Sequence, residues 1–159
     1  MLTISTSASR RESEDTSGPL LARRAEEAGA DVDAMEVVPD DAALIEDRLH
    51  HYVDEDYALV LTTGGTGLTP DDVTPEATYA VIDRDVPGMA EALRAESVRH
   101  TPMGMLSRGV VGIAGRTLII NLPGSPKAID QLAAVLAPVL RHAVETLRSE
   151  GGRRSRHQA

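Results

Sequence analysis

A glycine-rich run that follows an apolar segment is the part of this sequence best suited to chemistry. Residues 57–62 form a compact apolar run, typical of a parallel strand buried on both faces, and Gly64-Gly65-Thr66-Gly67 follow after one residue. Glycines let backbone N–H groups approach phosphate oxygens, and Thr66 adds a hydroxyl. The run is therefore suited to hold an anion. A tight turn at the exit of the strand is the plainer alternative.

The residues after the glycines distinguish this loop from two common nucleotide-binding motifs. No Gly-Lys-Ser/Thr follows, so the Walker motif of nucleotide hydrolases is missing, and the GxGxxG dinucleotide motif is missing too. Instead, Asp71 and Asp72 lie between the glycines and a helix expected to begin at Thr74-Pro75-Glu76. Such a loop can present both anion-binding amides and the oxygen ligands that Mg²⁺ prefers.

These segments resemble the molybdopterin adenylyltransferase family of the MogA/MoaB type. Its hallmark is a TTGGTG segment followed at short range by DVTPEA, and both pieces are intact at residues 62–67 and 72–77. The resemblance continues in further segments, at residues 15–18, 87–89, 106–108 and 121–126, with Glu91 and Arg94. It therefore covers nearly the whole chain.

The resemblance also implies which residues form the site. In that family, one aspartate after the glycine loop and another at a strand-to-helix corner are the acidic residues of the active site, and Asp72 and Asp40 match them. Both are expected to be catalytic and to bind the metal. The residues expected to bind molybdopterin or its phosphate are Gly64, Gly65, Thr66, Gly67, Ser107, Arg108, Asn121, Pro123, Gly124 and Ser125.

The implied reaction belongs to molybdenum cofactor biosynthesis: ATP and Mg²⁺ adenylylate molybdopterin, giving adenylyl-molybdopterin and pyrophosphate. Mg²⁺ would neutralise the triphosphate through carboxylate, phosphate and water oxygens. The attacking phosphate of molybdopterin is already anionic, so positioning should matter more than a strong general base. Residues 123–125 would form a second anion site, because a helix N-terminus favours negative charge.

Some positions depart from the family pattern or have a plainer interpretation. The chain has Asp71 where the family often has a basic residue, and Thr6 where many members have an aspartate. Asp40 could simply cap a helix, and Asn121 could satisfy backbone groups at the end of a strand. Residues 107–108 could form a surface ion pair, and Lys127 could merely cover its helix.

Alternating strand and helix patterns predict a three-layer α/β fold, with a mostly parallel, doubly wound sheet, helices on both faces and a small antiparallel hairpin near the C-terminal half. Strands are expected at residues 2–5, 32–38, 57–62, 110–114 and 117–121, the last two joined by a turn at residues 115–116. Helices are expected from a Ser17 cap to Gly29, after a cap at residues 40–41, over residues 74–83 and 88–99, and from a Ser125 cap, with a bend at Pro138.

Composition limits the remaining possibilities. The 159 residues suit one domain, expected over residues 1–150, with a flexible and dispensable tail at 151–159. The absence of cysteine excludes a thiolate metal site, and the five histidines form no HExxH-like pattern. A net charge of −9 argues against a nucleic-acid partner. No apolar run is long enough to span a membrane, so a cytoplasmic protein is expected.

Other functions remain as alternatives. The loop also resembles the related domain of competence-damage (CinA-type) proteins, associated with hydrolysis of pyrophosphate bonds, although that relative usually has leucine where this chain has Thr66. A catalytically silent, trimeric molybdopterin-binding module is a third possibility. The resemblance implies molybdopterin and ATP as partners, a homotrimer or hexamer, and allows the molybdenum-insertion enzyme as a further partner.

Overall fold

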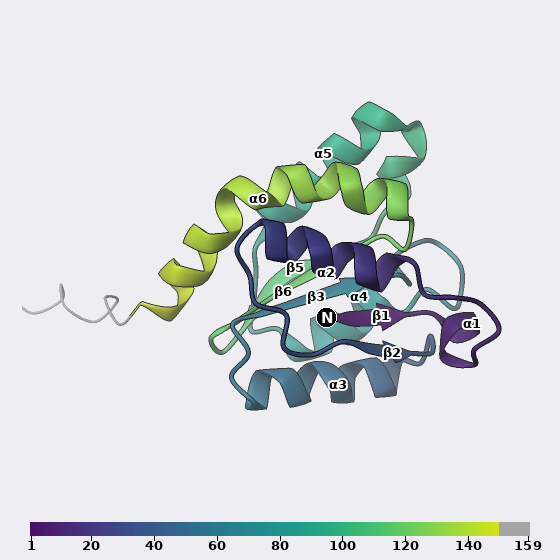
Figure 1. Ribbon diagram of the computed structural model, residues 1–159, viewed down its shortest axis with the longest axis horizontal. Helices are drawn as coiled ribbons and strands as arrows, with labels where there is room; N and C mark the ends of the chain where they lie inside the picture. The colour runs from purple at the N-terminus through teal and green to yellow at the C-terminus, as the bar shows by residue number, and fades with distance from the viewer. Residues whose placement is uncertain (150–159) are drawn as a thin grey trace, which may run out of the picture.

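A single mixed sheet forms the centre of the computed structural model, which describes residues 1–149 (Figure 1). The sheet has six strands in the order β2-β1-β3-β6-β5-β4. The strands are β1 (Leu2–Ile4), β2 (Glu36–Val38), β3 (Leu59–Thr63), β4 (Arg84–Asp85), β5 (Val111–Ala114) and β6 (Thr117–Leu122). The tail expected at residues 151–159 lies outside the described residues.

Helices cover both faces of this sheet, as the sequence predicts. They are α1 (Thr6–Ser9), α2 (Ser17–Glu27), α3 (Ala42–Asp54), α4 (Thr74–Val81), α5 (Pro87–His100), the 3₁₀ helix η1 (Pro102–Leu106) and α6 (Pro126–Arg148). Buried side chains of α2, α5 and α6 form one apolar cluster with the sheet, and those of α3 and α4 form a second cluster with its other face. The predicted three-layer fold is confirmed.

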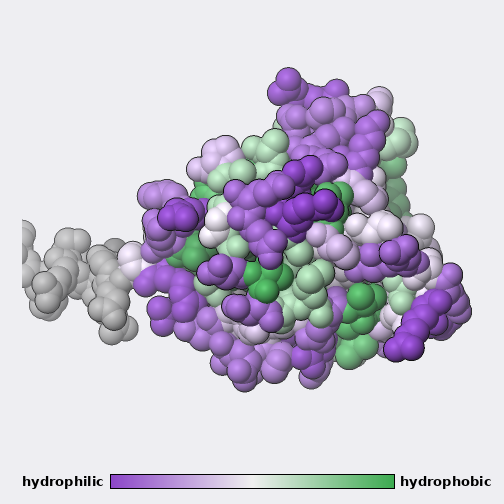
Figure 2. Space-filling view, in the orientation of Figure 1, coloured by the Kyte–Doolittle hydropathy of each residue, from purple (hydrophilic) through white to green (hydrophobic). Residues whose placement is uncertain are grey.

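The central strands explain why the apolar runs are continuous. In β3, Val60 belongs to one cluster and Leu61 to the other, because successive side chains point to opposite faces of a sheet. In β6, Ile119 and Ile120 are divided in the same way. With most large apolar side chains inside, hydrophilic residues predominate on the face seen in Figure 2, and hydrophobic ones form small separate groups there.

The pairing of the strands fixes where ligands can bind. β1, β3 and β6 run parallel and adjacent, so their carboxyl ends meet at one edge of the sheet. β5 and β6 form the predicted antiparallel hairpin, in which Gly115 has a φ of +56°. α6 contains Pro138 and changes direction in its C-terminal half, as predicted from the missing N–H of proline (Figure 1).

Several local predictions were wrong. The strand expected at residues 32–38 is only Glu36–Val38, because β2 is an edge strand whose sole partner, β1, begins its pairing at Leu2 opposite Glu36. Ser17 does not cap α2; it is the first helical residue. The Oδ1 atom of Asp15 instead accepts hydrogen bonds from the backbone N–H groups of Ser17, at 3.1 Å, and Gly18, at 2.9 Å.

Three short elements were not predicted: α1, β4 and η1. α1 forms within a polar run that was expected to be a loop, and Ser5 caps it by accepting from the Ala8 N–H at 3.3 Å. Among residues 1–149, no helix is long and apolar enough to cross a membrane.

Candidate functional site

A cleft of about 640 Å³ lies at the carboxyl ends of the parallel strands. Most of the candidate residues line it together: Asp40, Gly64, Gly65, Thr66, Gly67, Asp72, Ser107, Pro123, Gly124 and Ser125. The other two candidates, Arg108 and Asn121, are not among the lining residues. The fold therefore gathers residues from distant parts of the chain at one edge of the sheet.

The glycine loop turns tightly where β3 ends. Gly64 and Gly65 have φ values of +101° and +63°, a region that favours glycine. A Cβ atom at Gly64 would lie 2.2 Å from the carbonyl oxygen of Ile4, and one at Gly65 would lie 2.4 Å from Oγ1 of Thr74. These glycines are thus required by the turn itself, whatever the loop binds.

A buried threonine fastens this loop to the start of α4. Thr74 donates from Oγ1 to the Gly64 carbonyl at 2.9 Å, and its N–H donates to the Gly65 carbonyl at 3.1 Å. The sequence reasoning gave Thr74 no role in the site. The sequence does show a threonine at a helix start, ten residues after the first glycine of the turn. This spacing alone does not predict the contact, which depends on how the intervening loop folds back.

The glycine loop and the start of α6 lie side by side. A Cβ atom at Gly124 would be 3.3 Å from Cα of Gly64, and Oγ1 of Thr63 donates to the Pro123 carbonyl at 2.9 Å. Ser125 caps α6 by accepting from the Ala128 N–H. The two segments predicted to bind anions therefore form one continuous wall.

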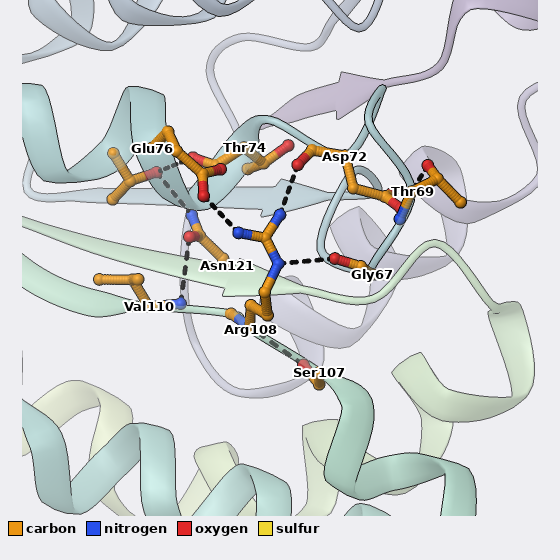
Figure 3. A network of polar contacts seen from close by, with 11 residues as sticks. Gly67, Thr69, Asp72, Thr74, Glu76, Ser107, Arg108, Val110 and Asn121 are labelled. Carbon is orange, nitrogen blue, oxygen red and sulfur yellow. Dashed lines mark hydrogen bonds and ion pairs between the residues drawn. The ribbon is translucent and has the colours of Figure 1, made fainter.

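One threonine supplies two of the hydrogen bonds that hold the carboxylate of Asp72. Its Oδ2 atom accepts from both the backbone N–H of Thr69, at 2.8 Å, and the hydroxyl of Thr69, at 2.7 Å (Figure 3). Partial burial by itself raises the pKa of Asp72. These hydrogen bonds, a backbone N–H of Gly67 and the charge of Arg108 together outweigh burial, so the pKa lies below its ordinary value. Asp72 is therefore ionised at neutral pH.

Asp40 is held in the same way by another threonine. Its Oδ2 atom accepts from the N–H of Thr6 at 2.9 Å and from its hydroxyl at 2.7 Å, and the Asp40 N–H donates back to Oγ1 of Thr6 at 3.0 Å. The helix cap of α3 is Asp41, which accepts from the Leu44 N–H at 3.0 Å. Asp40 is thus left free of capping, and its Oδ1 atom faces the glycine loop, 3.4 Å from where a Cβ of Gly65 would lie.

The donor atoms fit a hard divalent cation that is bound partly by substrate. Within residues 1–149, no group of three or more histidine, aspartate or glutamate side chains could hold a metal by itself. Mg²⁺ usually takes one or two carboxylates and completes its shell with phosphate and water oxygens. Asp40 and Asp72, both on the cleft wall, match that pattern.

Arg108 contacts the loop next to the cleft and not the cleft itself. Its Nε donates to the Gly67 carbonyl at 2.7 Å, Nη2 donates to the Asp72 carbonyl at 2.5 Å, and Nη1 pairs with the carboxylate of Glu76 (Figure 3). The pKa of Glu76 lies below its ordinary value, chiefly because Arg108 donates to it. The structure thus places Arg108 as a bridge across the loop.

Asn121 lies in the core, where its side-chain amide makes three hydrogen bonds to neighbouring residues. Its Oδ1 accepts from the Val110 N–H at 3.1 Å, and its Nδ2 donates to the hydroxyls of Thr62 and Thr78 at 3.0 Å each (Figure 3). Its side chain is almost fully buried. This arrangement matches the plainer interpretation of Asn121, in which it satisfies polar groups at the end of a strand.

The outer wall of the cleft comes from residues that the sequence reasoning did not select. Met103, Gly104 and Leu106 of η1 line the cleft, together with His100 at the end of α5. Lys127, the chain's one lysine, also lines it from the first turn of α6. Of the residues of η1, only Leu106 stands in a segment that resembles the family, and the position of η1 depends on its packing against α5.

Several known proteins that this chain resembles carry names connected with molybdopterin or the molybdenum cofactor. A family model described as a probable molybdopterin binding domain matches residues 1–142. The molybdopterin adenylyltransferase of Haemophilus influenzae is 50% identical over 96 residues, covering 60% of this chain and 49% of that protein. The Drosophila melanogaster molybdenum cofactor synthesis protein cinnamon is 40% identical over 149 residues, covering 92% of this chain and 25% of that protein.

Solved structures agree with these sequence matches. The crystal structure of the molybdopterin biosynthesis enzyme MoaB from Thermus thermophilus has 46% sequence identity and a TM-score of 0.86, with 92% of each chain covered. The chain spans half or less of the length of the two curated relatives above.

Proposed function

The chain belongs to the family of probable molybdopterin binding domains, and from that premise we propose that it is a nucleotidyltransferase that adenylylates molybdopterin. In this reaction a phosphate oxygen of molybdopterin attacks the α-phosphorus of ATP. The bond from that phosphorus to the bridging oxygen breaks, and pyrophosphate leaves. The products are adenylyl-molybdopterin and pyrophosphate. The name of the Haemophilus influenzae relative, molybdopterin adenylyltransferase, supports this transfer.

The observation that carries this proposal is the pair of threonine-held carboxylates beside an anion-binding wall. Asp40 and Asp72 each keep one oxygen fixed by two hydrogen bonds from a threonine, which limits their motion. The Gly64–Gly67 loop and the Gly124-Ser125 helix start line the same cleft. Carboxylates and anion-binding amides are both needed when two polyanionic substrates must meet.

Each part of the cleft has a defined task in this mechanism. The backbone N–H groups of the glycine loop and of the first turn of α6 orient phosphate groups. Lys127 adds a positive charge at the same wall. Asp40 and Asp72 would hold Mg²⁺, which, when bound, neutralises the triphosphate and stabilises the charge that develops on pyrophosphate.

A direct assay tests the reaction. Purified protein incubated with ATP, Mg²⁺ and molybdopterin should produce adenylyl-molybdopterin and pyrophosphate in equal amounts, measured by mass spectrometry. Hydrolysis of a pyrophosphate bond without any pterin would instead support the CinA-type alternative. Binding of molybdopterin with no product would support a catalytically silent binding module.

We also propose that the protein forms a homotrimer or a hexamer and acts in the cytoplasm, with the molybdenum-insertion enzyme as a further partner. These proposals rest on the resemblance to the MogA/MoaB type and on the apolar faces that its helices offer for assembly. Size-exclusion chromatography with light scattering at micromolar concentration tests the first of them. A monomer at every concentration would contradict it.

A further inference from the structure

We propose that Arg108 and Glu76 form a clamp that sets the position of Asp72, so that Arg108 is a positioning residue and not a phosphate ligand. This inference deepens the proposed function and rests on it for the role of Asp72. It departs from the expectation, based on family resemblance, that Arg108 binds molybdopterin or its phosphate.

The contacts of Arg108 run along one loop. Its backbone N–H donates to the Thr66 carbonyl at 2.9 Å, and its side chain reaches the carbonyls of Gly67, at 2.7 Å, and Asp72, at 2.5 Å. Its remaining terminal nitrogen pairs with Glu76 on the first turn of α4 (Figure 3). One side chain therefore joins the glycine loop, the segment carrying the carboxylate and the next helix.

Most of the donors of the guanidinium are already used within the protein. Each of its three nitrogens already donates to the protein, in a planar arrangement that fixes the direction of every N–H. Glu76 also neutralises its charge. Of its five N–H groups, the two that remain lie one on each terminal nitrogen, and Arg108 is not among the residues that line the cleft.

The segment that the clamp holds lacks regular structure. Residues 64–73 connect β3 to α4 through turns and bends. Besides the clamp, Asp72 is held there by Thr69, through its own N–H to the Thr69 carbonyl at 3.0 Å and through the Thr69 donors to its carboxylate. The clamp adds a fixed point outside this local turn, which ties the turn to the segment before β5 and to α4.

The matched variants are Arg108→Gln, Arg108→Lys, Glu76→Gln and the double Arg108→Gln/Glu76→Gln. We expect Glu76→Gln to lower kcat about tenfold and Arg108→Gln about 100-fold, with KM for ATP nearly unchanged. Arg108→Lys should not restore kcat, because one ammonium cannot reach three separated acceptors. The double variant should be no worse than Arg108→Gln alone, since the two residues act as one unit.

A second readout needs no substrate. Hydrogen exchange of the amides of Thr69 and Asp72 should be about tenfold faster in Glu76→Gln and in Arg108→Gln, while the amides of β3 and β6 keep their protection. Arg24→Gln is the matched control, because Arg24 pairs with Glu27 and Asp130 on the surface and none of the three lines the cleft. It should change neither exchange nor kcat.

Opposite results would overturn the clamp. If Arg108 binds phosphate, Glu76→Gln frees its guanidinium and tightens ATP or pterin binding, and Arg108→Gln raises KM with no change in loop exchange. Failure of the unaltered protein to adenylylate molybdopterin would contradict the proposed function alone. The exchange measurement would still decide whether Arg108 and Glu76 hold the loop.

Discussion

Asp40 and Asp72 come from different parts of the chain, yet the same device holds each of them. In both, one carboxylate oxygen accepts the backbone N–H and the hydroxyl of a threonine that lies outside any family signature used to select the aspartate. Hydrogen bonds to an ionised group are stronger than those between neutral groups and also lower its pKa. The threonines therefore fix the direction of both carboxylates, and Thr69 also helps to hold the pKa of Asp72 below its ordinary value.

Replacing Asp72 by asparagine tests its role most directly. Asp72→Asn keeps the size of the side chain but removes the charge, so we expect turnover to fall about 100-fold or more. Binding of molybdopterin should survive, because the glycine loop and α6 supply most of its anion contacts. Single-turnover adenylylation and equilibrium pterin binding measure the two effects separately.

Asp71→Asn is the matched control. Asp71 is exposed and accepts no hydrogen bond from the described residues, so this variant should keep most of the activity. If Asp71→Asn were the more damaging change, the assignment of Asp72 would be wrong.

Thr6 offers a test of how Asp40 is held. Thr6→Val removes the hydroxyl that donates to Asp40 and accepts from its N–H, but keeps the backbone donor. We expect turnover to drop about tenfold, equivalent to about 1.4 kcal/mol, within the range for a hydrogen bond to a charged group. Steady-state kinetics at saturating ATP measures it. Thr146→Val, an exposed change on α6, should have no effect, and an equal loss there would point to a nonspecific cause.

Both aspartates could be selected from the sequence, because each matches a position where the family has an acidic residue of the active site. Thr6 and Thr69 could not, because threonine is common in loops and only the folded turn brings each hydroxyl to its acceptor. Thr74 stands in the DVTPEA segment, but its contact with the glycine loop also depends on the folded turn. The same holds for Arg108. The sequence indicated that Arg108 is a site residue. Its role is suggested by its contacts with Gly67 and Glu76, which only the fold brings close: Glu76 lies 32 positions away in the chain.

At the scale of elements, Asn121 joins β6 to its neighbours. Its amide bonds the Val110 N–H before β5, Thr62 on β3 and Thr78 on α4, all in the interior. Asn121→Ala would leave these groups buried without partners. We expect it to lower the free energy of unfolding by about 2–4 kcal/mol, measured by urea denaturation.

The control for this change is Val139→Ala on α6. Val139 is about half exposed, so its truncation should alter stability by about 0.5 kcal/mol or less. A loss from Asn121→Ala as small as that of the control would show that Asn121 does not hold the strands, and the expectation of a ligand contact would then regain support.

The type and order of the long elements were predictable, because apolar periodicity and glycine or proline boundaries are local signals. The length of a strand was predictable only where the strands that pair with it were also evident from the sequence. The edge strand β2 is shorter than its apolar run because its pairing with β1 limits it. The 3₁₀ helix η1 escaped prediction, since η1 packs on α5, where a Cβ at Gly104 would lie 2.5 Å from the carbonyl carbon of Ser97.

At the scale of the whole molecule, the free energy of unfolding should fall when the solution is made acidic. The pKa values of Asp56, Asp72 and Glu76 lie below their ordinary values of 3.8, 3.8 and 4.5 in the folded chain. Groups with depressed pKa values stabilise the fold at pH above the ordinary value, and this contribution disappears as pH falls through the lowered value.

Urea denaturation should therefore give similar free energies of unfolding, as far as these groups are concerned, at pH 7 and pH 6, and a lower one at pH 3. Because Asp56 and Glu76 are more than half exposed to solvent and Asp72 is only partly buried, the loss should be modest and should shrink further in high salt. Stability that rose between pH 6 and pH 3 would contradict the assigned directions.

The parallel pairing of β3 with β6 has a kinetic consequence. Thr63 and Pro123, which meet at the cleft, are 60 positions apart in the chain. Contacts between such distant residues form late in folding, because the entropy cost of closing a long loop comes before the contacts can stabilise the chain. During refolding, helical signal should thus recover before the affinity for phosphate compounds. A newly made chain would remain unable to capture its substrate until its second half has joined the sheet.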